Sequence, residues 1–65
     1  MLLSKRLYKL RKEQNLTLQA LHLRCGVSMA SLSAYETGKY APSIETLCKL
    51  ANFYGVTLDY LLGRE

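Results

Sequence analysis

The feature that most restricts the fold of this chain is the regular placement of glycine, and of serine or threonine, at the ends of its apolar segments. Each of the four glycines follows a short segment in which apolar residues recur every three or four positions, as along one face of an α-helix. Glycine favours the left-handed conformation in which helices commonly end, whereas a serine or threonine side chain caps the start of a helix. Such caps precede four of the segments, at Thr17, Ser28, Ser43 and Thr57. With a further apolar repeat from about Leu2 to Gln14, the pattern predicts five short helices and an all-α fold.

The length of 65 residues predicts a single domain over residues 1–65. A domain of this size buries only about 60% of the surface that its unfolded chain exposes, so it depends on well-packed helices or on a partner. Cys25 and Cys48 each fall within an apolar helical pattern, where a reduced thiol packs as a small apolar group. A disulfide between them is the alternative that the sequence leaves. No apolar run approaches the roughly 20 residues of a membrane span. We therefore expect a cytoplasmic protein that is not associated with a membrane.

Charge and chemistry-bearing residues leave few classes of function. Nine Lys and Arg against five Asp and Glu give a formal net charge of +4, which suits a nucleic-acid partner but also serves solubility. The single histidine, His22, stands three residues before Cys25, and two ligands do not make a zinc site. No nucleophile and base stand at the sequence spacing that a catalytic site requires. We expect no enzyme, no metal or other cofactor and no small-molecule ligand.

Residues 16–42 contain the arrangement that points to a function. A helix of about eight residues is followed by a turn containing Gly26 and then by a second helix of similar size. Leu21, Val27 and Leu32 are placed to hold the two helices crossed. Such a unit projects the outer face of its second helix, and the major groove of DNA, about 12 Å wide, admits a helix.

The segment resembles the helix-turn-helix of the phage-repressor and Cro-like (Xre-type) family. The resemblance is carried by Leu16-Thr17, Leu21, Gly26-Val27-Ser28, Leu32-Ser33, Tyr35-Glu36, Gly38-Lys39 and Pro42-Ser43. It continues on both sides of the motif, through Leu10-Arg11, Leu47, Leu50-Ala51, Gly55-Val56 and residues 58–63. It implies a compact five-helix bundle of the lambda-repressor-like type, with the helix-turn-helix at helices two and three. It also implies double-stranded DNA as the partner, and a bacterial or phage-encoded protein that is associated with the nucleoid.

The resemblance implies roles for individual residues. Arg11 and Glu36 match positions that form an ion pair between the first and third helices, and each interrupts an apolar neighbourhood in which a charge needs a partner. A second set matches positions at helix starts and in the turn after the third helix, where hydroxyl, N–H and ammonium groups contact phosphates. This set comprises Thr17, Ser28, Ser31, Thr37 and Lys39. Capping by Thr17 and Ser28 is compatible with phosphate contact.

The face that would read bases departs from the family pattern. The expected base-facing residues of the third helix are Met29, Ala30, Ser33 and Ala34. Relatives usually carry amide or guanidinium groups here, because these bind purine edges through two hydrogen bonds. Met29 and Ala30 can instead contact thymine methyl groups, and Ser33 can bond almost any base. We therefore expect specificity to come largely from methyl contacts and from DNA shape.

An alternative function follows from the same apolar character. Six residues are placed to form an apolar patch on or beside the outer face of the motif: Leu18, Leu23, Met29, Ala30, Ala34 and Tyr40. Contiguous apolar patches often mark protein interfaces. The chain would then be a protein-interaction module of the antitoxin, adaptor or anti-repressor kind.

The C-terminal region carries more apolar and aromatic residues than a core of this size easily covers. In the resembled family this region often helps to form a dimer, which predicts an interface of Tyr54, Val56, Leu58, Tyr60 and Leu61. A two-fold dimer would place the two third helices about 34 Å apart, one turn of DNA, and would require a pseudo-palindromic operator. By analogy with the family, we expect a transcriptional regulator that represses by blocking polymerase.

Overall fold

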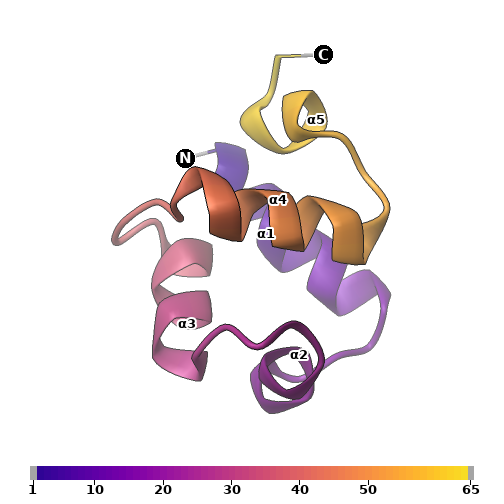
Figure 1. Cartoon of the computed structure of the whole chain (residues 1–65), viewed down its shortest axis with the longest axis vertical. Coiled ribbons are helices and arrows are strands. Elements are labelled where there is room, and N and C mark those ends of the chain that lie inside the picture. Colours follow the sequence, from indigo (N-terminus) through magenta and orange to yellow (C-terminus); the bar gives the residue numbers. More distant parts are fainter. Residues whose placement is uncertain (1, 65) are drawn as a thin grey trace.

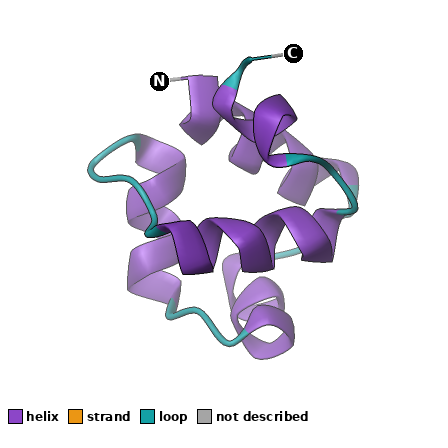
Figure 2. Cartoon of the chain, turned by 45° about the horizontal axis from the view of Figure 1, so that its top comes forward, coloured by secondary structure: helices purple, strands orange, loops and turns teal. Residues whose placement is uncertain are grey.

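The computed structural model describes residues 2–64, which contain five helices and no strand (Figures 1 and 2). In chain order they are α1 (Leu2–Glu13), α2 (Leu18–Cys25), α3 (Met29–Thr37), α4 (Ile44–Tyr54) and α5 (Leu58–Leu62). Both cysteines are half-buried free thiols. The all-α, five-helix expectation is confirmed, and α1 ends one residue before the predicted Gln14.

The caps that the sequence predicts form the helix boundaries. Each of the four Ser and Thr side chains accepts a hydrogen bond, 3.0–3.2 Å long, from the backbone N–H three residues ahead. These bonds satisfy N–H groups that would otherwise lack a partner in the first turn. At the other ends, all four glycines adopt positive φ angles of 69–78°. Local capping signals therefore mark both ends of α2 to α5.

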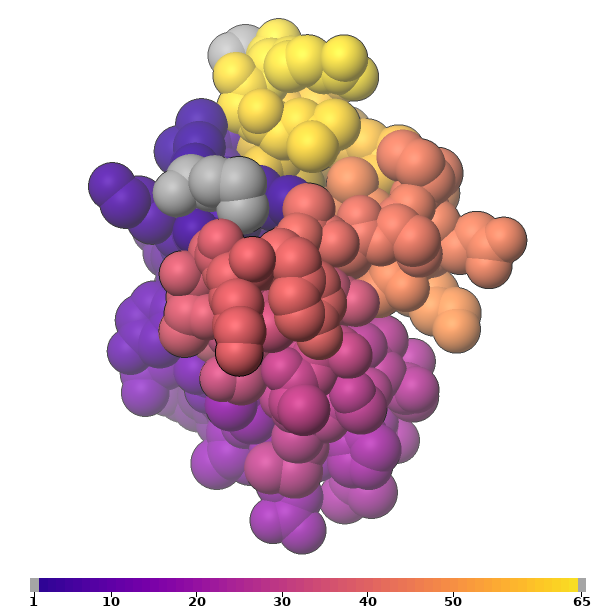
Figure 3. Space-filling view, turned by 90° about the vertical axis from the view of Figure 1, so that its left-hand side faces the viewer, coloured from indigo at the N-terminus to yellow at the C-terminus, as the bar shows by residue number. Residues whose placement is uncertain are grey.

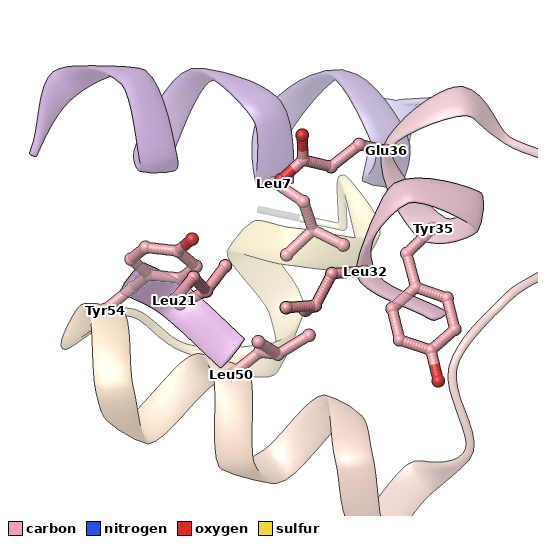
Figure 4. Close-up of a pocket in the computed structure, with 7 residues that line it drawn as sticks. All are labelled: Leu7, Leu21, Leu32, Tyr35, Glu36, Leu50 and Tyr54. Atoms are coloured by element: carbon pink, nitrogen blue, oxygen red, sulfur yellow. The ribbon is translucent and has the colours of Figure 1, made fainter. Parts of the chain in front are cut away.

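The core lies where the helices cross. α1 packs on α3 and α5, while α2 packs on α3 and α4. Figure 4 shows Leu7, Leu21, Leu32 and Leu50 pointing toward one another from α1, α2, α3 and α4, with no room left for a water molecule between them. This packing fixes the orientation of α3 relative to α2, and so the direction in which the outer side of α3 faces.

Candidate nucleic-acid interface

A tight turn joins α2 to α3. Gly26 adopts a φ of 76°, and its N–H donates to His22 O at 2.9 Å, which ends α2. A Cβ at this glycine would meet nothing within 4 Å, so the backbone angle rather than lack of space favours glycine here. His22 Nδ1–H donates to Val27 O at 2.8 Å. This bond joins α2 to the turn, so we interpret His22 as a structural residue.

The side of α3 that looks away from the core is small and weakly polar. Its exposed or half-buried members are Met29, Ala30, Ser33 and Thr37, which we call the outward face of α3. Met29 is 43% exposed. Figure 3 views the molecule from this side, where α3 and the loop after it form a rounded surface. A convex helix surface of this kind fits a groove rather than enclosing a small molecule.

Ala34 does not belong to this face, contrary to the sequence prediction. It is 7% exposed, and so it cannot contact a base edge in this structure. Ala34 lies at the edge of the stripe next to the buried Tyr35. The loop returning to α4 (Figure 2) contacts this part of α3: the Tyr40 ring packs edge-on against the Tyr35 ring, with centroids 5.7 Å apart, and Lys39 N–H donates to Ala34 O at 2.9 Å.

Internal hydrogen bonds engage the hydroxyl groups of Ser28, Ser31 and Thr37. Thr37 Oγ1 donates to Ser33 O at 3.0 Å and lies 3.3 Å from Ala34 O, so its proton stays within the helix. Ser28 Oγ donates to Ser31 Oγ at 2.9 Å while accepting from Ser31 N–H. Within residues 2–64, the hydroxyl of Ser33 enters no such bond. Ser33 is thus the one member of the outward face with an uncommitted hydroxyl.

The residues expected at phosphates lie at helix ends. Thr17 is exposed at the start of α2, and its oxygen accepts from Ala20 N–H, so its own proton can still be donated. Ser31 is half-buried in the first turn of α3, and Lys39 is exposed just beyond the end of α3. The hydroxyl groups of Thr37 and Ser28 already donate hydrogen bonds to acceptors in α3. The hydroxyl protons of Thr17 and Ser31 and the ammonium group of Lys39 are not engaged in these bonds.

Arg11 and Glu36 form the ion pair that the resemblance implies. Arg11 Nε donates to Glu36 Oε2 at 2.8 Å and Nη2 donates to Oε1 at 2.9 Å, while Nη1 donates to Leu16 O at 2.8 Å. The two side chains are only 10% and 7% exposed. The hydrogen bonds that Arg11 donates to Glu36 raise the pKa of Arg11 despite the opposing effect of burial. The pair joins α1 to the last turn of α3 and thereby holds the outward face in place.

Tyr54 lies close to this pair and carries an unsatisfied polar group. Its hydroxyl is buried without a hydrogen-bond partner among residues 2–64. Burial, assisted by the negative charge of Glu36, raises the pKa of Tyr54 to about 12. Figure 4 shows its ring beside Leu21. The hydroxyl therefore costs free energy in the folded state, and its ionisation costs more.

We expect Tyr54→Phe to raise the free energy of unfolding at pH 8 by about 1 kcal/mol, because it removes a buried donor that has no acceptor. The wild-type chain should in addition lose stability as the pH rises from about 10, the unfolded value of tyrosine, toward 12, because the folded state holds this proton more tightly. That loss should reach about 1 kcal/mol at pH 11. Urea unfolding of both proteins at pH 8 and pH 11 measures it. An equal alkaline loss in Tyr54→Phe would contradict this assignment.

Two residues of the expected dimer interface are unavailable to a partner. Leu61 is completely buried and Tyr54 is 8% exposed, because both belong to the core of the single chain. Val56, Leu58 and Tyr60 are half-buried and pack against that core. Among the described residues of α1 and α5, Leu2 and Leu62 are exposed large apolar side chains at this end of the molecule, and Leu2 reaches Gly63 across the α1–α5 contact. A dimer surface here would be centred on these two leucines.

The apolar patch behind the alternative function is smaller than predicted. Leu23 is 73% exposed and Tyr40 is 48% exposed, and Met29 and Ala30 also reach the surface. Leu18 instead packs against the core, as a half-buried residue, and Ala34 is buried. The exposed part of the patch is therefore divided between α2, the start of α3 and the loop after α3.

Residues 2–64 contain neither a metal-binding cluster nor a membrane-crossing helix. No cluster of three or more His, Cys, Asp or Glu side chains stands close enough to hold a metal ion. Among the same residues, no helix has the length and apolar character that crossing a membrane requires.

Comparison with known proteins places this geometry in a family. The family model described as "Helix-turn-helix" matches residues 7–61. The chain is 42% identical over 60 residues to the HTH-type transcriptional regulator AnsR of Bacillus subtilis, covering 92% of this chain and 52% of that protein. It is 37% identical over 65 residues to the HTH-type transcriptional regulator ImmR of Bacillus subtilis, covering 100% of this chain and 51% of that protein.

A third relative, the HTH-type transcriptional activator BcrR of Enterococcus faecalis, is 37% identical over 62 residues, covering 95% of this chain and 30% of that protein. The chain spans about half the length of the first of the curated relatives it matches. No solved structure gives a significant match. The chain belongs to the helix-turn-helix family, in its phage-repressor-like (Xre) form, whose matched members are named transcriptional regulators and not enzymes.

Proposed function

We propose that this chain binds double-stranded DNA by placing α3 in the major groove, and that it regulates transcription. The observation that carries the proposal is the outward face of α3, held at a fixed angle to α2 by the leucine core and to α1 by the Arg11–Glu36 pair. Its relatives' names support the regulatory part. The proposed DNA binding takes place in the cytoplasm, at the nucleoid.

The finer mechanism follows from symmetry. We propose a homodimer joined at the end formed by α5 and the start of α1, where Leu2 and Leu62 are exposed and Val56, Leu58 and Tyr60 are half-buried. Two α3 helices about 34 Å apart would then read a pseudo-palindromic operator. Occupancy of an operator near a promoter would repress transcription by excluding polymerase. The name of BcrR shows that activators also occur among the relatives.

Lys39→Ala should weaken DNA binding and make the affinity less dependent on salt. An ammonium group that neutralises one phosphate releases condensed counterions, so its loss should lower the slope of log K against log salt by about 1. A gel-shift series with genomic fragments from about 50 mM salt upward measures the slope. Lys9→Ala, which removes an exposed charge from α1, is the matched control and should leave the slope nearly unchanged.

Absence of any DNA binding at the lowest salt would contradict the proposed function. In that case the second candidate, a protein-interaction module, would gain support. The observation that favours it is the side chain of Leu23, whose 73% exposure on α2 has no use in the DNA-binding mechanism.

A further inference from the structure

The outward face of α3 presents methyl and thioether groups where relatives of this fold would need hydrogen-bonding groups to read purines. Met29 and Ala30 are exposed at its start, and neither carries a polar group that can distinguish bases. Thr37 keeps its hydroxyl proton within the helix, through its bond to Ser33 O, which leaves its methyl group as an apolar contact. No member of the face bears an amide or a guanidinium. The surface is therefore suited to apolar groups in the groove.

The major groove offers one apolar group, the methyl on C5 of thymine. Cytosine presents a hydrogen at the same position and an N4 amine beside it, whereas thymine presents the O4 acceptor. In 5-methylcytosine the C5 methyl is restored while the N4 amine remains. A reader that depends on the methyl alone would therefore group 5-methylcytosine with thymine, unless a polar side chain separates O4 from N4.

Ser33 is the side chain in a position to make that distinction, and its chemistry does not allow it. A serine hydroxyl rotates freely, so it can donate to the O4 of thymine or accept from the N4 amine of cytosine. Ser33 Oγ is not locked in either role by a hydrogen bond within residues 2–64. The partner purine is read weakly as well, because no side chain of the face can form the paired hydrogen bonds that identify adenine or guanine.

We propose that the outward face of α3 recognises the C5 methyl group of pyrimidines, so that thymine and 5-methylcytosine are equivalent at the positions it covers. Methylation of cytosine at these positions then strengthens binding, and DNA methylation becomes a control on where this protein binds. The inference rests on the proposed function, since it concerns DNA held against α3. It adds a class of DNA target that neither the family match nor the relatives' names assign.

The test compares base pairs that differ by one methyl group. A duplex carrying a site selected by the protein is prepared with thymine, deoxyuracil, cytosine or 5-methylcytosine at each thymine in turn, and affinities are measured by fluorescence anisotropy. Burial of one methyl group should be worth about fourfold in affinity. We expect thymine over deoxyuracil and 5-methylcytosine over cytosine to give the same ratio, with thymine and 5-methylcytosine within about twofold of each other.

A ratio near one in either methyl comparison at every substituted position overturns the inference, while DNA binding itself would be intact. Failure of every duplex to bind would instead contradict the proposed function, so the two failures are distinguishable. Met29→Ser should reduce both methyl ratios at the affected position. Leu23→Ser removes an exposed apolar side chain outside the outward face and should leave both ratios unchanged. Circular dichroism of both variants checks that the helices are retained.

Discussion

Arg11→Ala should lower the free energy of unfolding by about 3–5 kcal/mol, because it leaves the Glu36 carboxylate buried without its partner. Three charge-assisted hydrogen bonds join the two side chains, at 2.8–3.1 Å, and a fourth runs from the guanidinium to Leu16 O. Domains of this size have only about 0.05–0.15 kcal/mol of stability per residue, so much of the total would be lost. Urea unfolding followed by circular dichroism measures the change.

Arg24→Ala is the matched control, because Arg24 is an exposed arginine near the end of α2. It should change stability by less than about 0.5 kcal/mol. Adding Glu36→Gln to Arg11→Ala should cost less than the sum of the two single changes, since the second change removes the stranded charge. A loss below about half a kilocalorie per mole in Arg11→Ala would show that the pair does not hold α1 to α3.

Leu21→Ala is expected to cost about 2–5 kcal/mol, because it opens a cavity at the point where four helices meet. Leu21 is 1% exposed and lies against Leu7, Leu32 and Leu50 (Figure 4). For a domain of this size, each kilocalorie per mole lowers Tm by about 4–8 °C, so thermal melting resolves the effect easily.

Leu23→Ala supplies the comparison within the same helix. It removes the same atoms from a side chain that is 73% exposed, and its effect should stay within about 0.5 kcal/mol. Equal losses in the two variants would mean that α2 packs through a different face from the one described.

The sequence predicted the helix boundaries because they depend on local chemistry. A threonine or serine before an apolar repeat and a glycine after it satisfy the backbone groups at helix ends wherever the helix later packs. The link between Arg11 and Glu36 was also predictable, from the resemblance and from the cost of an unpaired charge in apolar surroundings. These features need no knowledge of how the helices are arranged.

The sequence predictions differ from the structure where the exposure of a side chain depends on how the helices are arranged. Periodicity shows which side of a helix is apolar, but not how far neighbouring segments cover its edges. The sequence pattern places Ala34 on the surface, whereas in the structure it is 7% exposed, beside the Tyr35 ring on which Tyr40 of the following loop packs. Tyr54 and Leu61 were assigned to a dimer although the core of one chain already contains them. The commitment of the Thr37 hydroxyl to Ser33 O likewise depends on a side-chain rotamer that no sequence pattern reveals.

The most direct test of the central claim, that α3 reads the major groove of DNA, is selection of bound duplexes from a random pool. The proposed function predicts enrichment of thymine-containing half-sites in inverted pairs, with centres about 10 base pairs or a multiple of a helical turn apart. Met29→Glu should abolish the enrichment, because it places a carboxylate against the bases and phosphates. A folded wild-type chain that enriches no sequence, or that enriches the same sites after Met29→Glu, would contradict the claim.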